Sequence, residues 1–222
     1  EYIHVDVLPA ELSLPRRYAF RYLEIKVIDV SMKFSVVIDD VYVKAGSSVC
    51  QDDISPLKME DPLLRTVDHV AIRTLPNCMQ DVFEDGPKRD RRLWLGDFRL
   101  QARANYVTFK NYDLVKRCLY LFGGMTFNEG KISACLFTEP QPEPDDTYLF
   151  DCALLYGSAL LDYYEETKDE ETLRELYPMA VRQIEIGLDY LDEDNVIPDR
   201  SDEFWCFVDW GEGLNKQAAS IA

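Results

Sequence analysis

The sequence predicts a mainly α-helical protein whose helices are preceded by a few antiparallel β-strands. The first fifty residues are rich in β-branched and aromatic side chains, which favour strands. From Asp61 onward, apolar residues recur every three or four positions, which is the helical period. The hydrophobic content of 47% across 222 residues is typical of a folded core rather than a disordered acidic segment.

The predicted strands lie at residues 22–27, 34–38 and 41–43. In the first of them Leu23, Ile25 and Val27 alternate with charged residues and share one face. We therefore expect an antiparallel sheet or part of a β-sandwich. Because a polar, proline-containing stretch follows, we place the domain boundary there, with a β domain at 1–57 and a helical domain at 58–222.

The first predicted helix starts at Asp61, a good N-cap residue, followed by Pro62 at the first helical position, and runs for about twenty residues. A second helix is expected over 98–110. A third starts at a cap formed by Asn111 or Asp113 and ends at the glycine pair 123–124.

The second half of the chain reads as a long loop, two helices and an aromatic cluster. The loop spans 125–146, and its acidic, proline-containing part is expected to be a solvated spacer. The helices are expected at 147–166 and 170–191, with Pro178 restarting the second of them. The aromatic cluster lies at 204–210, and residues 215–222 read as a helix that has just begun.

Antiparallel helices joined by loops of unequal length are typical of a toroid of helical hairpins, with short connections on one side and long functional ones on the other. A plain helical bundle gives the same helical pattern. The pattern alone leaves both architectures open.

Composition excludes several classes of function. With 24 Lys and Arg against 41 Asp and Glu, the net charge is −17, which opposes binding to nucleic acid and to anionic membranes. The chain contains no apolar run long enough for a transmembrane helix. The six cysteines form no CxxC pair and are expected to be buried free thiols, so we predict no metal site. No glycine-rich phosphate loop is present, and we predict no cofactor.

The densest group of chemically active residues is the run 85–97, where a glycine and a proline force a turn between two predicted helices. It contains three carboxylates, Asp85, Asp90 and Asp97, together with basic residues and Trp94. One interpretation is a surface ion-pair network with Asp97 as a helix cap. The aromatic side chain favours a sugar site, which needs hydrogen-bonding groups, a flat apolar surface and an acid or base.

The run VFEDGPKRDRRLWLGD resembles the characteristic motif of the bacterial α-L-rhamnosidases, glycoside hydrolase family 78. The residues that match in register are Asp85, Pro87, Arg89, Arg91, Trp94, Gly96 and Asp97. Later stretches around 128–132, 138–149 and 207–210 resemble the same family more loosely. The resemblance covers residues 60–222 and implies the N-terminal half of an (α/α)6 toroid, with the end of a β-sandwich before it.

The resemblance also implies an activity, the hydrolysis of terminal α-L-rhamnosides with inversion of configuration, and a secreted or periplasmic location. The family's general acid is a Glu, and the matching residue here is Asp90, whose side chain is one methylene shorter. The resemblance assigns sugar contacts to the remaining candidates: Asp85, Arg89, Trp94, Asp97, Asp209 and Trp210. Asp85 is the alternative acid, and core packing is the alternative role for Trp205 and Trp210.

In the family the general base lies further along the chain than residue 222, so we expect this sequence to be a piece of an enzyme and inactive by itself. The carbohydrate is the expected partner, and the sequence leaves the oligomeric state open. Two alternatives remain: a related inverting glycosidase or phosphorylase with another sugar preference, and a carbohydrate-binding homologue that has lost the acid. The Asp at position 90 keeps the second alternative open.

Overall fold

A computed structural model describes residues 1–50, 54, 57–198 and 203–211. The chain forms two compact units, Glu1–Val43 and Lys44–Ala222. The domain boundary expected after residue 57 lies within the second unit. The helix predicted at 215–222 lies outside the described residues.

The first unit contains no helix or strand, although all of its residues are described. The strands predicted at 22–27, 34–38 and 41–43 do not form. The apolar face expected for the first of them is half exposed, with Leu23 at 49%, Ile25 at 53% and Val27 at 51%. A strand pair without a packed apolar face is only marginally stable, which accounts for the difference.

The second unit is mainly helical, as predicted. Its described residues form five α-helices, α1 (Pro62–Cys78), α2 (Leu95–Val107), α3 (Tyr112–Gly124), α4 (Phe150–Thr167) and α5 (Glu170–Leu188), and a short 3-10 helix, η2 (Asn128–Gly130). Three of the helices have side-chain caps at their N-termini. The carboxylate of Asp61 accepts hydrogen bonds from two backbone N–H groups of the first turn of α1, while Asn111 caps α3 and Asp169 caps α5. Pro178 lies inside α5 rather than at a restart of the helix.

The structure contains a few short antiparallel strands, four of them within the predicted loop 125–146 and one, β1, earlier in the chain. β1 (Leu93–Trp94), β4 (Cys135–Phe137) and β5 (Glu143–Pro144) form one sheet in the order β1-β4-β5, and β2 (Thr126–Phe127) pairs with β3 (Lys131–Ile132). In the first sheet Leu93 is opposite Leu136, and Phe137 is opposite Glu143. The acidic, proline-containing stretch is therefore exposed at 139–143 and 146, as predicted, but Glu143 and Pro144 form one side of a hairpin.

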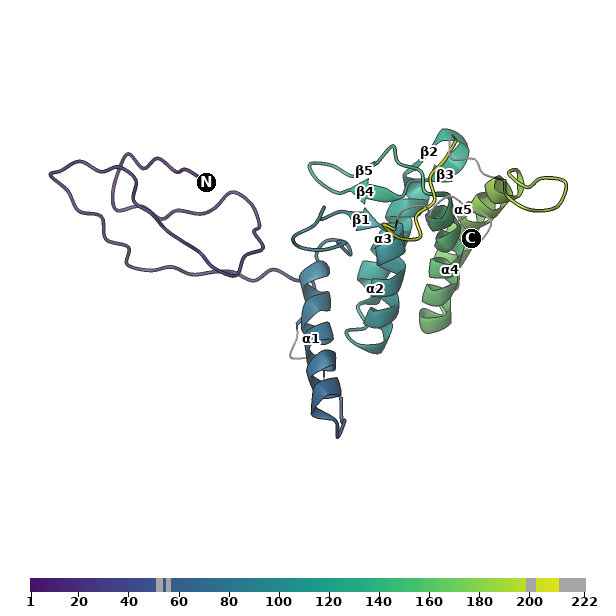
Figure 1. The fold of residues 1–222 in the computed structure, drawn as a ribbon, viewed down its shortest axis with the longest axis horizontal. Helices are drawn as coiled ribbons and strands as arrows, with labels where there is room; N and C mark the ends of the chain where they lie inside the picture. The colour runs from purple at the N-terminus through teal and green to yellow at the C-terminus, as the bar shows by residue number, and fades with distance from the viewer. Residues whose placement is uncertain (51–53, 55–56, 199–202, 212–222) are drawn as a thin grey trace. The chain divides into compact units, whose positions relative to one another are not determined.

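The connections between α2 and α5 differ in length at the two ends of the helices (Figure 1). Short connections join α2 to α3 and α4 to α5. The long connection, which carries β2 to β5, joins α3 to α4 at the opposite end, where α2 and α4 begin. This is the asymmetry predicted for a toroid of helical hairpins, and it places the candidate loop 85–97 at the end with the long connections.

The core lies between α2, α3, α4 and α5. Its largest fully buried side chains include Phe83, Phe98, Phe122 and Tyr156. The helix α3 needs a glycine at 123, because a Cβ there would lie 2.6 Å from the hydroxyl oxygen of Tyr156. Burying aromatic side chains of this size stabilises the unit by about 1.5–3 kcal/mol each.

Five of the six cysteines are buried free thiols, as predicted, and Cys50 is exposed. Burial raises the pKa of the Cys118 thiol to about 12, so this thiol stays protonated at neutral pH. None of the described helices has the length and apolar character needed to cross a membrane.

Candidate functional site

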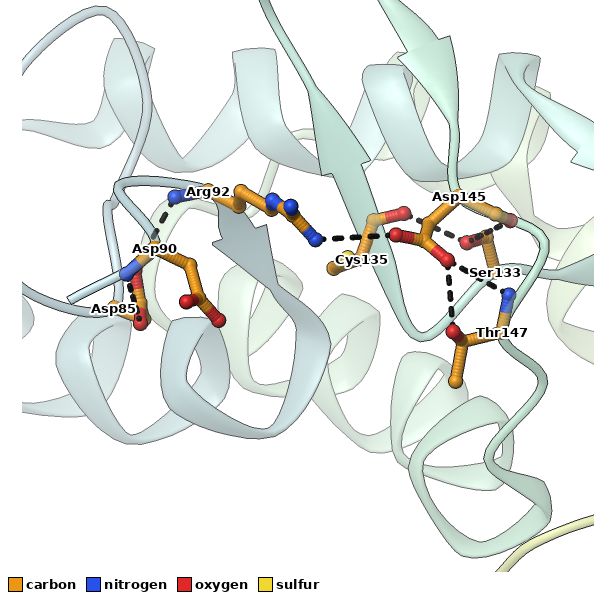
Figure 2. A network of polar contacts seen from close by, with 7 residues as sticks. All are labelled: Asp85, Asp90, Arg92, Ser133, Cys135, Asp145 and Thr147. Atoms are coloured by element: carbon orange, nitrogen blue, oxygen red, sulfur yellow. Dashed lines mark hydrogen bonds and ion pairs between the residues drawn. The ribbon is translucent and has the colours of Figure 1, made fainter.

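The loop that follows Asp85 is closed by the carboxylate of that residue. The Asp85 side chain is 1% exposed. Its Oδ1 accepts the backbone N–H of Arg92 at 3.2 Å, and its Oδ2 accepts that of Asp90 at 3.3 Å (Figure 2). Its backbone N–H donates to the Arg92 carbonyl at 3.0 Å, and the Arg89 Nε lies 3.5 Å from Oδ2. Asp85 therefore holds the loop from inside.

Asp90, the predicted acid, lies on the exposed side of this loop. Figure 2 shows its side chain beside that of Asp85 and below the Arg92 side chain. Since the backbone N–H of Asp90 is held by a buried carboxylate, the Cα position of Asp90 is fixed while its own carboxylate stays accessible. That combination suits a group that must reach an external substrate.

Asp97 lies in the first turn of α2, which begins at Leu95, three residues earlier than predicted. It does not cap the helix, because Trp94 occupies the N-cap position. Burial raises the pKa of Asp97, and the carboxylates of Asp85 and Asp90 raise it further, while the Arg89 guanidinium lowers it in part. The structure thus brings four of the predicted site residues, Asp85, Arg89, Asp90 and Asp97, into one electrostatic group.

Trp94 connects this group to the aromatic segment 203–211. Trp94 and Phe207 pack against the same small cluster of buried residues, which consists of Ala134, Leu149 and Cys152. The Phe207 ring contacts that of Trp210 at a centroid distance of 4.9 Å. Trp210 is 75% exposed, so one of its faces is available to a ligand. Asp209 is also exposed, and its Oδ1 accepts the backbone N–H of Trp210 at 2.7 Å.

Trp205 is 42% exposed and its ring contacts that of Trp210, so the core packing considered for these two residues does not occur in the described chain. The backbone of Trp205 is fixed against the start of α4: its carbonyl accepts the N–H of Phe150 at 3.0 Å, and its N–H donates to the Tyr148 carbonyl at 3.4 Å.

Asp151 is a residue that sequence reasoning missed. It lies in the first turn of α4, and its Oδ1 accepts the backbone N–H of Phe207 at 3.2 Å. Burial raises the pKa of Asp151, and the hydrogen bonds from backbone N–H groups oppose that effect. An acidic residue at a helix start is too common to indicate this contact, because it depends on a segment more than fifty residues away.

Asp145 and Arg92 were also missed. Their side chains form an ion pair with an Nη1 to Oδ2 distance of 3.2 Å, which joins the loop to the β4–β5 hairpin (Figure 2). Asp145 belongs to the stretch predicted to be solvated, yet its side chain is only 12% exposed. The partner that buries it is far away in the sequence, so no local pattern indicated the pair.

The arrangement combines an accessible carboxylate, a half-buried carboxyl group with a raised pKa, a guanidinium group and exposed aromatic rings. These groups suit a sugar, because carboxylates and guanidinium groups bind hydroxyls and an aromatic ring packs against the C–H face of the pyranose. Among the described residues, no group of three or more His, Cys, Asp or Glu side chains could hold a metal ion. Two surface hollows, one along α1 and one between α4 and α5, contain none of the site residues.

Two family models match the chain. Residues 1–45 match the glycosyl hydrolase family 78 alpha-rhamnosidase N-terminal domain. Residues 52–220, more than half of the chain, match the bacterial alpha-L-rhamnosidase 6 hairpin glycosidase domain. No curated protein gives a significant match.

Two solved structures resemble the fold. A rhamnosidase from Klebsiella oxytoca with rhamnose bound is 52% identical, with a TM-score of 0.72 over 76% of this chain and 33% of that chain. A family 78 rhamnosidase of Bacillus sp. GL1 is 21% identical, with a TM-score of 0.64 over 75% of this chain and 17% of that chain, a likeness of fold alone. The chain thus spans a third or less of either solved chain.

Proposed function

Because this chain belongs to glycoside hydrolase family 78, the bacterial α-L-rhamnosidases with a six-hairpin domain, we propose that it forms part of an enzyme that hydrolyses terminal α-L-rhamnosides with inversion of configuration. The Klebsiella oxytoca relative, which is 52% identical and has rhamnose bound, supports rhamnose as the sugar. The proposal concerns the whole protein, and this chain supplies the acid side of its active site.

In the proposed reaction Asp90 is the general acid. Its carboxylic acid gives a proton to the glycosidic oxygen as the bond from the anomeric carbon to that oxygen breaks. A second carboxylate removes a proton from the water that attacks the opposite face of the sugar. In inverting glycosidases the two carboxyl groups are about 6.5–9.5 Å apart. We assign no described residue to the role of base.

The observation that supports this role for Asp90 is the difference in burial and hydrogen bonding between Asp85 and Asp90. Asp85 is buried and its oxygens are occupied by backbone N–H groups, so it is the poorer candidate for the acid. Asp90 is exposed, and its backbone is fixed by that same carboxylate. Since an Asp side chain reaches less far than a Glu, a fixed backbone matters more here than in the family pattern.

The other candidates take sugar-binding roles in the proposal. Arg89 and Asp97 lie beside Asp90 and would bind sugar hydroxyls, and Asp209 would add a further polar contact. Trp94 and Trp210 would supply ring surfaces, since Trp210 is exposed and Trp94 packs with the same cluster as Phe207. A sugar between the loop and the aromatic segment would meet both kinds of group.

The test is hydrolysis of an aryl α-L-rhamnoside by the full-length protein that contains this chain, with the first-formed sugar observed by NMR. We expect free rhamnose that appears first as the β-anomer. Retention of the α configuration would contradict the inverting mechanism. Consumption of inorganic phosphate during turnover would indicate a phosphorylase. A rise in melting temperature with rhamnose but no turnover would indicate a binding protein. If the Asp90→Glu variant of such a protein gained activity, the missing turnover would be due to the shorter side chain of Asp90.

A further inference from the structure

The Arg92 side chain extends from the loop to Asp145, next to the β4–β5 hairpin (Figure 2). Its Nη1 lies 3.2 Å from Asp145 Oδ2, and its guanidinium carbon lies 4.2 Å from the centroid of the Phe137 ring. Arg92 is one of the positions that the rhamnosidase motif leaves unspecified. Its side chain is 34% exposed, so it is better placed to hold the loop than to bind an external ligand.

The acceptor of this interaction is itself firmly held. Asp145 Oδ1 accepts the backbone N–H of Thr147 at 2.9 Å and its hydroxyl at 2.7 Å. The hydroxyl of Ser133 donates to the Asp145 carbonyl at 2.8 Å, and the Asp145 N–H donates to the Cys135 carbonyl at 3.1 Å. Although burial opposes ionisation, the hydrogen bonds from Thr147 help to keep the pKa of Asp145 below its usual value. Asp145 is therefore a fixed carboxylate.

The contacts form a continuous series that ends at Asp90. Asp145 binds the Arg92 side chain, the Arg92 backbone is paired with Asp85 in both directions, and the Asp85 carboxylate accepts the N–H of Asp90. We propose that the Arg92–Asp145 ion pair is a positioning element that fixes the carboxyl group of Asp90 relative to the β4–β5 hairpin. This inference rests on the proposed role of Asp90 as the acid.

The physical reason is the strict geometry of proton transfer. A displacement of about 1 Å at a catalytic group can reduce the rate about 100-fold. A half-buried, charge-assisted hydrogen bond is stronger and more directional than a surface ion pair. The loop 85–92 is held by its own internal contacts and by β1, which follows it directly and pairs with β4. The ion pair adds a side-chain tie between the loop and the same hairpin.

Leaving-group dependence tests this inference in the full-length protein. The dinitrophenolate of a 2,4-dinitrophenyl α-L-rhamnoside leaves without being protonated. The methoxide of a methyl α-L-rhamnoside is a poor leaving group and needs a proton from the acid. We expect Arg92→Met to lower kcat on the methyl rhamnoside about tenfold or more, with little change on the dinitrophenyl rhamnoside and in KM. Arg92→Lys should restore part of the loss, because it keeps the charge near Asp145.

The matched control is Arg99→Met. Arg99 forms a similar ion pair with Asp162, at 3.0 Å and with side chains 25% and 22% exposed, but this pair joins α2 to α4 away from the loop. We expect that variant to lower the melting temperature without changing the ratio of rates on the two rhamnosides. If Arg92→Met does not fold, Asp145→Asn replaces it, because Asn has nearly the same shape as Asp and removes only the charge that binds Arg92. The same two rates are then measured on this variant.

The outcomes separate this inference from the proposed function. If Asp90→Asn affects both rhamnosides equally, Asp90 is not the acid and both proposals fail. If Asp90→Asn shows the expected dependence but Arg92→Met and Asp145→Asn lower both rates equally, the positioning role alone is overturned. In a protein that already carries Asp90→Asn, Arg92→Met should have no further effect on the methyl rhamnoside, because the two changes act through the same group.

Discussion

The buried carboxylate of Asp85 accepts a hydrogen bond from the backbone N–H of Asp90 at 3.3 Å. Two carboxylates five residues apart therefore have different roles: one shapes the loop from inside, and the other is presented to solvent. A family motif alone does not separate these roles, because it records both simply as acidic positions. The separation has consequences for stability that can be measured on this chain.

Replacing Asp85 by Ala should destabilise the second unit by about 1–3 kcal/mol, because the N–H groups of Asp90 and Arg92 lose their acceptor. Asp90→Ala, the control in the same loop, should change the free energy of unfolding by less than about 0.5 kcal/mol, since that side chain is exposed. Urea unfolding measures both. Equal effects of the two substitutions would contradict the assignment.

Asp97→Asn should raise the melting temperature at pH 7. The pKa of Asp97 is raised in the folded chain, so the ionised form at neutral pH opposes folding and the neutral amide does not. This destabilising contribution diminishes as the pH falls through the raised folded pKa and disappears below the unfolded pKa of about 3.9. The advantage of Asn should therefore shrink in acid.

The control for that series is Asp113→Asn, an exposed residue in the first turn of α3. Thermal unfolding from pH 3 to pH 8 provides the comparison. The helix dipole favours an acid at this position, so this variant should be slightly less stable than the original chain at pH 7. An Asp97→Asn variant that is less stable at every pH would contradict the prediction.

Asp169→Ala should destabilise the α4–α5 hairpin by about 1–2 kcal/mol. Its carboxylate accepts the N–H and hydroxyl of Thr172 at 3.0 and 2.7 Å and the Lys116 ammonium at 2.9 Å. These bonds hold the pKa of Asp169 well below its usual value, and the bond from the backbone N–H of Thr172 has the largest effect. The stabilisation is therefore fully present above the unfolded pKa of about 3.9, declines as the pH falls below it and is lost completely only at the much lower folded pKa. Denaturant titrations at pH 7 and pH 2.5 should show a smaller, but still measurable, difference between the two chains in acid.

Asp151→Ala should loosen the aromatic segment 203–211, because Phe207 loses the acceptor of its backbone N–H. We expect acrylamide to quench the tryptophan fluorescence of this variant more strongly than that of the original chain. Asp151→Asn keeps an acceptor oxygen in the same place and is the control. Unchanged quenching in the Ala variant would show that the segment is held without Asp151.

Features that depend on neighbouring residues could be predicted from the sequence. The caps at Asp61 and Asn111 and the loop between α4 and α5 follow from short local patterns, and all three are confirmed. The clustering of Asp85, Arg89, Asp90 and Asp97 follows from their closeness in the chain. The rhamnosidase family could be recognised because its motif lies in one continuous run.

Features that depend on residues far apart in the chain could not be predicted from the sequence. The ion pair of Arg92 with Asp145 and the bond from Phe207 to Asp151 each join segments more than fifty residues apart. The strands predicted in the first fifty residues have the right composition, but their apolar side chains are largely exposed. The composition of a segment shows that it would suit a packed sheet. Whether a sheet forms depends on packing against residues elsewhere in the chain, which composition does not show.

The most direct test of the central claim is hydrolysis of methyl α-L-rhamnoside by the full-length protein with Asp90 intact and with Asp90→Asn. General acid catalysis contributes about 100- to 10,000-fold, so the variant should lose activity by a factor in that range while still binding rhamnose. An Asp90→Asn protein that hydrolyses this substrate at the original rate would contradict the assignment of Asp90 as the acid.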